Sequence, residues 1–193
     1  CKKFLRKLCD FSPPPPRNHK NSFSRIQCGM IQKSYDRLRA VLYARRWAFS
    51  RNPAYFSFNS LGGDCTNFVS QCLFAGSGVM NYTPVFGWFY RSANDRTASW
   101  TGVEFLYNFL ISNRGDGPAA QEVSLCDVQL GDVIQLGRET GDFYHSCLVV
   151  GFRGSVPLVA SHSLDTYNKP LTRYVFERVR FLHITGVNAP QST

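Results

Sequence analysis

The residues best suited to covalent chemistry lie between positions 62 and 71, where a cysteine follows a glycine pair and an aspartate. The glycine pair predicts a turn, Asp64 is a typical helix-capping residue, and an apolar pattern with helical spacing starts at Cys65. A thiol in the first turn of a helix experiences the positive end of the helix dipole, which lowers its pKa and favours the thiolate. Cys65 is therefore the candidate nucleophile, with a buried helix cysteine as the structural alternative.

A cysteine hydrolase also needs a base, and one of the four histidines fits that role. His145 opens a strand whose following residues, up to Val150, are almost wholly apolar. A polar residue at the end of a buried strand usually projects into a cleft, so His145 is the predicted partner of Cys65. His19 falls in a basic segment and is expected to be solvated, whereas His183 on the last predicted strand is expected to be structural.

A third polar group should orient the imidazole of His145. The chain after His145 predicts a hairpin that turns near residues 151–155 and returns through residues 156–161 to His162. That return would bring His162 beside His145, while Asp165 and Asn168 are alternatives a few residues further on. We favour His162 as the orienting residue and keep Asp165 as its main alternative.

Substrate contacts can be predicted around Cys65 and in a long aromatic stretch over residues 76–100. The backbone N–H of Cys65 could donate to the oxyanion that forms when the thiolate attacks a carbonyl. Candidates for a second donor are polar residues near Cys65, namely Asn59, Ser60 and Asn67. Trp88 and Trp100 are predicted either to line the substrate cleft or to pack in the core. No cysteines and histidines share the spacing of a metal site, so we expect no metal and no other cofactor.

The elements that must position these residues follow from the apolar patterns. Three helices are predicted, over residues 35–49, 65–75 and 101–112. Four strands are predicted after Pro118, over residues 133–136, 144–152, 157–161 and 174–184. Helices first and strands afterwards indicate an α+β fold, with N-terminal helices packed on a C-terminal antiparallel sheet.

The 193 residues suffice for one well-cored domain. Residues 1–31 contain four consecutive prolines and many basic side chains, so we predict a flexible or loosely docked tail. The globular domain is predicted over residues 32–186, with a short C-terminal tail over 187–193. The formal net charge of +9 favours solubility or attraction to a polyanion such as an anionic cell-wall polymer. No nucleic-acid-binding signature accompanies this charge, so we expect no nucleic acid as partner.

The compartment is argued from the cysteines and from the lack of long apolar runs. Seven cysteines without a C-x-x-C pair favour free thiols and a reducing, cytoplasmic compartment. No secretory signal is visible, and no apolar run reaches the length of a membrane span, so no span is expected. The cell wall is the alternative location, and the sequence leaves the oligomeric state open.

Several of these segments resemble a known enzyme family. Residues 64–69 are similar to the D-C-[ST]-x-F-V motif of NlpC-type cell-wall cysteine peptidases, and residues 131–134, 145–150 and 159–162 resemble the strands that follow that motif. A closer resemblance is to the putative amidase domain family of Gram-positive bacteria, which is related to NlpC-type and CHAP peptidases. It covers about residues 33–184 and includes residues 35–37, 48–53, 62–71, 76–81, 99–101 and 161–165. Ser163 departs from the threonine that the family usually carries there.

The resemblance implies a papain-like fold and a cysteine-dependent amidase or peptidase. Cys65 would attack an amide carbonyl, His145 would transfer protons, and a thioester would form on Cys65. The substrate would contain an amide or thioester, with a cell-wall peptide as one candidate. Two alternatives stay open: an amide-forming acyltransferase that uses the same residues, and a non-catalytic module that binds polyanions.

Overall fold

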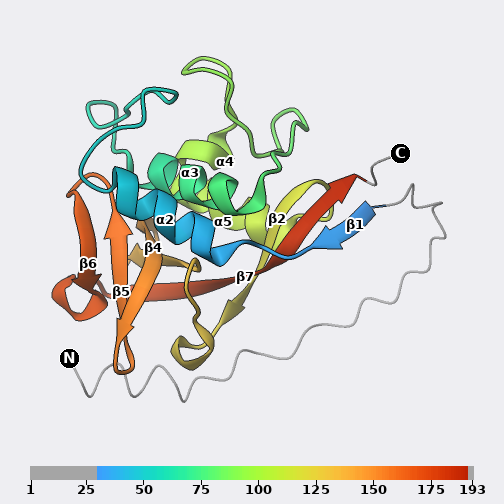
Figure 1. Ribbon diagram of the computed structural model, residues 1–193. Coiled ribbons are helices and arrows are strands. Elements are labelled where there is room, and N and C mark those ends of the chain that lie inside the picture. Colours follow the sequence, from blue (N-terminus) through green and yellow to red (C-terminus); the bar gives the residue numbers. More distant parts are fainter. Residues whose placement is uncertain (1–29, 191–193) are drawn as a thin grey trace.

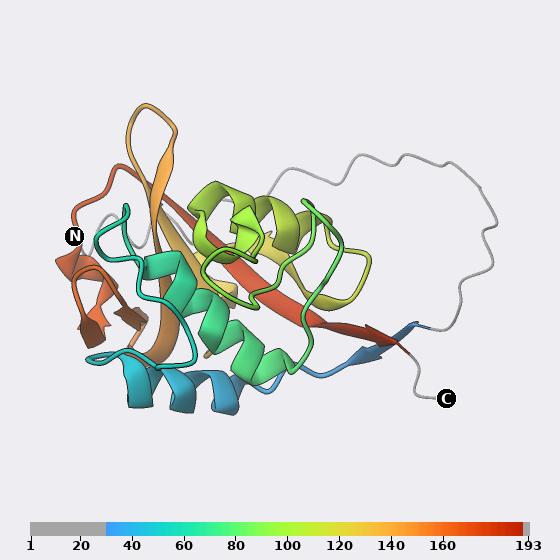
Figure 2. The same cartoon turned by 90° about the horizontal axis from the view of Figure 1, so that it is seen from above.

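The computed structural model of the protein describes residues 30–190 (Figure 1). Helices α2, α3 and α5 cover one face of a seven-stranded antiparallel sheet (Figures 1 and 2). The predicted α+β class is therefore confirmed. Most of the predicted 1–31 tail lies outside the described residues.

The helices are short and close together in the sequence. Their bounds are α2 Arg37–Trp47, α3 Cys65–Ser77, α4 Ala98–Thr101 and α5 Val103–Ser112. Asp36 begins α2 by accepting a hydrogen bond from the backbone of Arg39, and Gly78 ends α3 in the left-handed conformation that glycine favours (φ 66°). The predicted helix over 101–112 is divided, because Gly102 is extended and separates α4 from α5.

The sheet has the order β1-β7-β3-β4-β5-β6, and β2 pairs with β7. The strands are β1 Met30–Lys33, β2 Gly117–Val123, β3 Val133–Gly137, β4 Phe143–Arg153, β5 Val156–Ser161, β6 Thr166–Pro170 and β7 Arg178–Pro190, with short 3-10 helices η1 Leu125–Asp127 and η2 Leu171–Arg173. Strands β1, β2 and β6 were not predicted, and β7 starts later and runs further than the predicted strand. Pairing of β1 with the end of β7 extends the sheet beyond the predicted domain limits of 32 and 186.

Two apolar clusters lie on opposite faces of the sheet. Between the helices and the sheet, Phe68 and Leu148 belong to a core that includes the fully buried Trp88 and Trp100. On the other face, Cys147 and other strand residues pack against the short helices η1 and η2. Each fully buried large apolar side chain contributes about 1.5–3 kcal/mol to folding. The alternation along β4 therefore decides which face each of its side chains joins.

None of the helices within residues 30–190 is long and apolar enough to cross a membrane.

Candidate active site

Cys65 is the first residue of α3, as the sequence predicts. Gly62 and Gly63 lead into it with φ values of 103° and 117°, a conformation that glycine adopts without steric strain. Asp64 precedes the helix, but its side chain makes no capping hydrogen bond to the first turn. Its Oδ1 instead accepts hydrogen bonds from the Phe58 backbone and from Asn67 Nδ2, at 2.9 and 2.8 Å. Asp64 thus closes the loop before α3 and fixes where the helix begins.

The sulfur of Cys65 lies against the start of β4. At this end of the sheet β5 pairs with β4 only from Leu148 onward, so the N–H of Ser146 is not used by β5 and donates to the Cys65 sulfur. The Thr66 hydroxyl lies 3.8 Å from the same sulfur. Cys65 is only 7% exposed. The nucleophile candidate and the residue after His145 are therefore in direct contact.

Burial raises the pKa of the Cys65 thiol, and hydrogen bonds from Ser146 and Thr66 lower it without outweighing the burial. The predicted lowering by the helix dipole is therefore not the dominant effect, because removing a thiolate from water costs more than the helix terminus returns. The thiol is protonated at neutral pH. A base must then remove its proton during the reaction.

His145 is the third residue of β4 and is 9% exposed. Burial, with a smaller contribution from the nearby charge of Lys169, lowers the pKa of His145 from 6.5 to about 4. The imidazole lies beside the rings of Tyr144 and Tyr174, with centroid distances of 6.4 and 5.8 Å, and no hydrogen bond to another described residue holds it. His145 is therefore a neutral imidazole with free nitrogens, which can accept a proton.

His162 does not orient His145. Its ring stacks on Phe68 of α3 at 4.0 Å, on the helix side of the sheet, whereas His145 alternates with Ser146 and shares the face of Cys147. Its Nδ1 lies 2.7 Å from Asp64 Oδ2 and its Nε2 lies 2.9 Å from the Trp47 carbonyl oxygen. The predicted hydrogen bond between the two histidines is therefore absent, because both ring nitrogens of His162 already have partners.

The Asp64–His162 contact is a buried ion pair. Burial alone would raise the pKa of Asp64, but hydrogen bonds from His162, Phe58 and Asn67 outweigh it and leave the pKa lowered. The ionised carboxylate and the Trp47 carbonyl are both acceptors, and an imidazole with protons on both nitrogens would satisfy both of them. The pair connects the start of α3 to the end of β5 and to the end of α2.

Asp165, the alternative orienting residue, lies at the edge of this pair. Arg51 donates to both carboxylate oxygens of Asp165, at 2.8 and 2.9 Å, and its Nε lies 3.3 Å from Asp64 without hydrogen-bond geometry. Arg51 thus lies between the carboxylates of Asp64 and Asp165, and Asp64 also contacts His162. Asp165 contacts Arg51 and not His145.

A second group of polar side chains runs from the sheet to Cys65. Arg180 Nε donates to Gln135 Oε1 at 2.7 Å, which leaves Gln135 Nε2 to donate to Ser146 Oγ at 3.2 Å and to the Val103 carbonyl oxygen at 2.9 Å. Ser146 Oγ in turn lies 3.1 Å from Thr66 Oγ1. Either hydroxyl can be the donor in this contact. This series of contacts, which we call the Arg180 chain, leads from Arg180 through Gln135 and Ser146 to Thr66, whose hydroxyl lies beside the Cys65 sulfur.

Of the four residues predicted to contact substrate, three are buried in the structure. Trp88 and Trp100 have no exposed surface, and their indole N–H groups donate to Ser70 and Asn67, so both are core residues. Asn67 is 1% exposed, and its amide is used by Asp64, Phe56 and Trp100. Asn59 is exposed in the loop before Cys65. Of these four residues, only Asn59 lies at the surface.

Sequence reasoning missed the polar residues that support Cys65. Gln135, Ser146 and Arg180 each interrupt an apolar strand at a position that faces the helices. A buried polar side chain requires a partner, so this interruption was a usable signal. Arg51 gave none, because nothing in the local pattern indicates that it meets Asp64 and Asp165.

The structure also bears on the remaining cysteines and on metal binding. The free cysteines among the described residues are Cys65, Cys72 and Cys147, whereas Cys126 is disulfide-bonded and does not belong to the free thiols suggested by the sequence. Residues 30–190 contain no cluster of three or more histidines, cysteines or acidic residues that could hold a metal ion.

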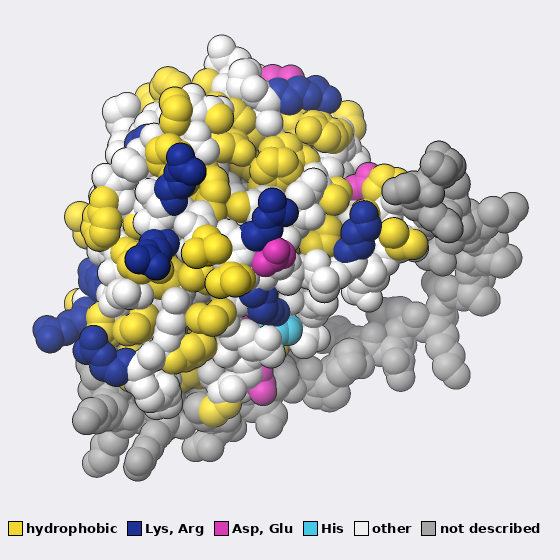
Figure 3. Space-filling view, viewed as in Figure 1, with side chains coloured by type: hydrophobic (Ala, Val, Ile, Leu, Met, Phe, Trp, Pro, Cys, Tyr) yellow, Lys and Arg dark blue, Asp and Glu magenta, His cyan; other side chains and the backbone are white. Residues whose placement is uncertain are grey.

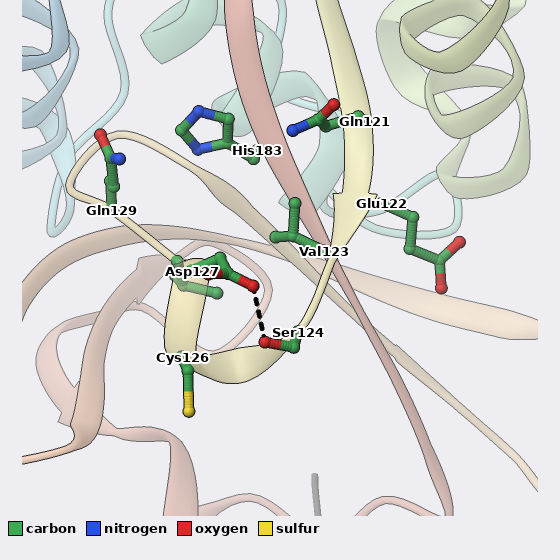
Figure 4. A pocket seen from close by; sticks show the side chains of 9 residues that line it. Gln121, Glu122, Val123, Ser124, Cys126, Asp127, Gln129 and His183 are labelled. Carbon is green, nitrogen blue, oxygen red and sulfur yellow. Dashed lines mark hydrogen bonds between the residues drawn. The ribbon is translucent and has the colours of Figure 1, made fainter. Parts of the chain in front are cut away.

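A polar hollow of about 550 Å³ lies beside β2 and η1 (Figure 4). Glu122, Asp127, Gln129 and His183 are among its lining residues. His183 is held by Asp132 at 2.9 Å, which agrees with the structural role predicted for it. None of the predicted catalytic residues lines this hollow.

Comparison with known proteins gives a family but no solved fold. Residues 34–184 match the sequence model of the family described as "Putative amidase domain". The chain is 36% identical over 136 residues to "Uncharacterized protein YhbB" of Bacillus subtilis (strain 168), a match that covers 68% of this chain and 42% of that protein. The chain thus spans less than half of this relative's length. No solved structure matches the chain.

Proposed function

The chain belongs to the putative amidase domain family, and from this membership we propose that it is a cysteine-dependent amidase that cleaves an amide bond through a thioester on Cys65. One observation carries the proposal: the Cys65 sulfur at the start of α3 accepts a hydrogen bond from the N–H that directly follows His145, a buried neutral imidazole. A thiol and an available base at the junction of a helix and a strand are the minimum for nucleophilic catalysis.

In the proposed reaction, His145 takes the thiol proton as the Cys65 sulfur attacks the amide carbonyl carbon. The carbonyl oxygen becomes an oxyanion, to which the backbone N–H of Cys65 at the helix terminus donates. The tetrahedral intermediate collapses when the C–N bond breaks and His145 gives its proton to the leaving amine. Water then attacks the thioester with His145 again as base, and the carboxylic acid and the free thiol are released.

The remaining predicted residues are assigned positioning roles in this proposal. The pair of Asp64 and His162 holds the first turn of α3 against β5, and Arg51 connects Asp165 to that pair. Cys65 lies at a helix start, and His145 lies on one of the antiparallel strands that follow. This arrangement also supports the papain-like relationship to NlpC-type and CHAP peptidases. The net charge of +9 suits an anionic substrate such as a cell-wall polymer.

Selective alkylation tests the nucleophile without knowledge of the substrate. A low concentration of iodoacetamide, followed by peptide mass spectrometry, should label Cys65 before Cys72 and Cys147, which have no exposed surface. His145→Gln should slow labelling of Cys65, whereas His183→Gln, at the hollow of Figure 4, should not. Equal labelling of Cys65 in the wild type and in His145→Gln would count against the Cys–His pair and favour a non-catalytic binding module.

Product analysis tests the reaction itself. Peptidoglycan fragments incubated with the protein should release new amines and carboxylic acids, and Cys65→Ser should abolish the release. Addition of a primary amine at high concentration separates hydrolysis from acyl transfer. If the acyl group appears only on the added amine and never on water, the hydrolase assignment is wrong and the acyltransferase alternative holds.

A further inference from the structure

The outward side of α2 has an unusual composition. Every exposed residue from Arg37 to Phe49 is either an arginine or a large apolar residue. These six residues, which we call the α2 outer face, are Leu38, Arg39, Leu42, Arg45, Arg46 and Phe49. Leu38, Leu42 and Phe49 are 65%, 50% and 70% exposed. Single exposed apolar residues are common in soluble proteins, but three on one helix side form a patch that calls for a partner.

The α2 outer face is not explained by the packing of the fold. The helix meets the core through Ala40, Val41 and Ala44 on its opposite side. Positions 38, 42 and 45 follow the i, i+4, i+7 spacing of a single helical stripe on α2, and Phe49 follows this stripe in the turn after the helix ends at Trp47. Figure 3 views the side of the molecule that carries α2 and shows Lys and Arg side chains interspersed with hydrophobic ones.

The arginines of this face have no acidic partner. Within residues 30–190 Arg37, Arg51 and other arginines form ion pairs with carboxylates, but Arg39, Arg45 and Arg46 form none. Arg46 only stacks on Trp47, with its guanidinium 5.1 Å from the ring centroid. Three uncompensated positive charges therefore lie beside the apolar stripe.

A shallow hollow adjoins the stripe. It measures about 370 Å³ and is lined by Arg39, Leu42, Tyr43, Arg46 and Ala75, so two guanidinium groups flank a mainly apolar floor. Such a lining is complementary to an anionic headgroup that continues into an apolar chain.

We propose that the α2 outer face binds the surface of a membrane that contains anionic phospholipids. The helix is a convex ridge, which can lie on a flat bilayer, and its arginines can reach lipid phosphates while Leu38, Leu42 and Phe49 insert below them. Each arginine near an anionic surface strengthens binding by about fivefold. A nucleic acid would use the arginines but would leave the three apolar side chains against phosphates and water, so it fits the face less well.

This inference does not depend on the amidase proposal, because no residue of the α2 outer face is assigned to the chemistry. The first experiment measures flotation of the full chain with vesicles of phosphatidylglycerol and phosphatidylcholine, against phosphatidylcholine alone. Arg45→Gln/Arg46→Gln should weaken binding to the anionic vesicles by about 25-fold. The matched variant Arg138→Gln, an exposed arginine of the β3–β4 hairpin, should weaken it by less than about twofold. Equal losses in both variants would overturn the proposal.

All of these variants keep the basic residues at positions 1–29, so vesicle binding alone does not show which part of the chain touches lipid. The second experiment therefore asks whether α2 itself does. After subtraction of the wild-type signal of Trp47, Trp88 and Trp100, Phe49→Trp should show a blue shift and quenching by brominated acyl chains when anionic vesicles are added. Phe86→Trp, at a more exposed phenylalanine of another loop, should show neither change in the same difference measurement. Equal quenching at both positions, or the same blue shift with soluble polyglutamate of the same charge in place of vesicles, would exclude a membrane contact through α2.

Discussion

The protonation of single buried residues controls this site. His145 carries a pKa lowered to about 4 because burial disfavours its charged form, and Asp64 stays ionised because three donors surround it. The two histidines thus have opposite roles: His145 is neutral and available, while both ring nitrogens of His162 already have partners. Sequence position alone does not distinguish these two residues.

The lowered pKa of His145 predicts a specific dependence of stability on pH. An unfolded histidine takes up its proton near pH 6.5, whereas folded His145 does so only near pH 4, so its contribution is complete above pH 6.5 and is lost as pH falls toward 4. Urea unfolding should show that wild type loses about 2 kcal/mol more than His145→Gln between pH 7 and pH 5. Equal losses would mean that His145 is protonated as easily in the folded protein as in solution.

The ion pair of His162 and Asp64 predicts a large structural effect of a conservative change. His162→Gln leaves the Asp64 carboxylate buried without its cation, which should lower the free energy of unfolding by about 3 kcal/mol at pH 7. Arg51→Gln is the matched control, because Arg51 is partly exposed, and it should cost less than about 1 kcal/mol.

Chemical denaturation measures both values. Nitrogen-15 NMR of the imidazole gives a second readout, in which both nitrogens of His162 should carry protons at pH 7. A neutral tautomer would contradict the assignment of an ion pair, whatever the stability of the variant.

At the scale of elements, the position of Cys65 depends on how α3 meets the ends of β4 and β5. Strand β5 ends before it reaches Ser146, which frees one backbone N–H for the sulfur, and the Arg180 chain brings further donors through β3 and β7. Arg180 itself is held between the rings of Tyr107 and Phe143, at 3.6 and 3.8 Å. Contacts through Gln135, Ser146 and Thr66 thus connect the charge of Arg180 to the Cys65 thiol.

This coupling predicts that a mutation on β7 changes the reactivity of a cysteine on α3. Arg180→Gln removes the positive end of the Arg180 chain, so the pKa of Cys65 should rise and alkylation at pH 7 should slow by about three- to tenfold. Arg178→Gln, an exposed residue two positions earlier on the same strand, should leave the rate unchanged. The pH dependence of the alkylation rate, followed at the Cys65 peptide, is the measurement. A slower rate without a shifted pH profile would indicate a change of access instead.

For the whole molecule, the net charge of +9 should affect substrate encounter more than chemistry. We expect kcat/KM on an anionic cell-wall polymer to fall at least about fivefold between 50 and 500 mM salt, because salt screens the attraction. The rate on a small uncharged amide should change little over the same range. Similar salt effects on both substrates would show that salt acts on the folded state or on the site, and not on the encounter.

Local patterns in the sequence predicted most of the helical residues, four of the strands, and a cysteine at the start of a helix. The glycine pair and Asp64 placed Cys65 at a helix start, and the apolar strand after His145 predicted β4, because both signals reside in neighbouring residues. The α+β class followed from the order of these elements. Strands β1, β2 and β6 escaped prediction because they have few apolar residues and rely on pairing with β5 or β7.

Only the tertiary structure decided which side chains meet and which are charged. Strand register and the place where β5 ends direct His162 to Asp64 and away from His145, and the core absorbs Trp88 and Trp100. Burial likewise reverses the expected direction of the Cys65 pKa. The physical reason is that helix and strand formation depend on nearby residues, whereas desolvation and ion pairing depend on neighbours that come from distant parts of the chain.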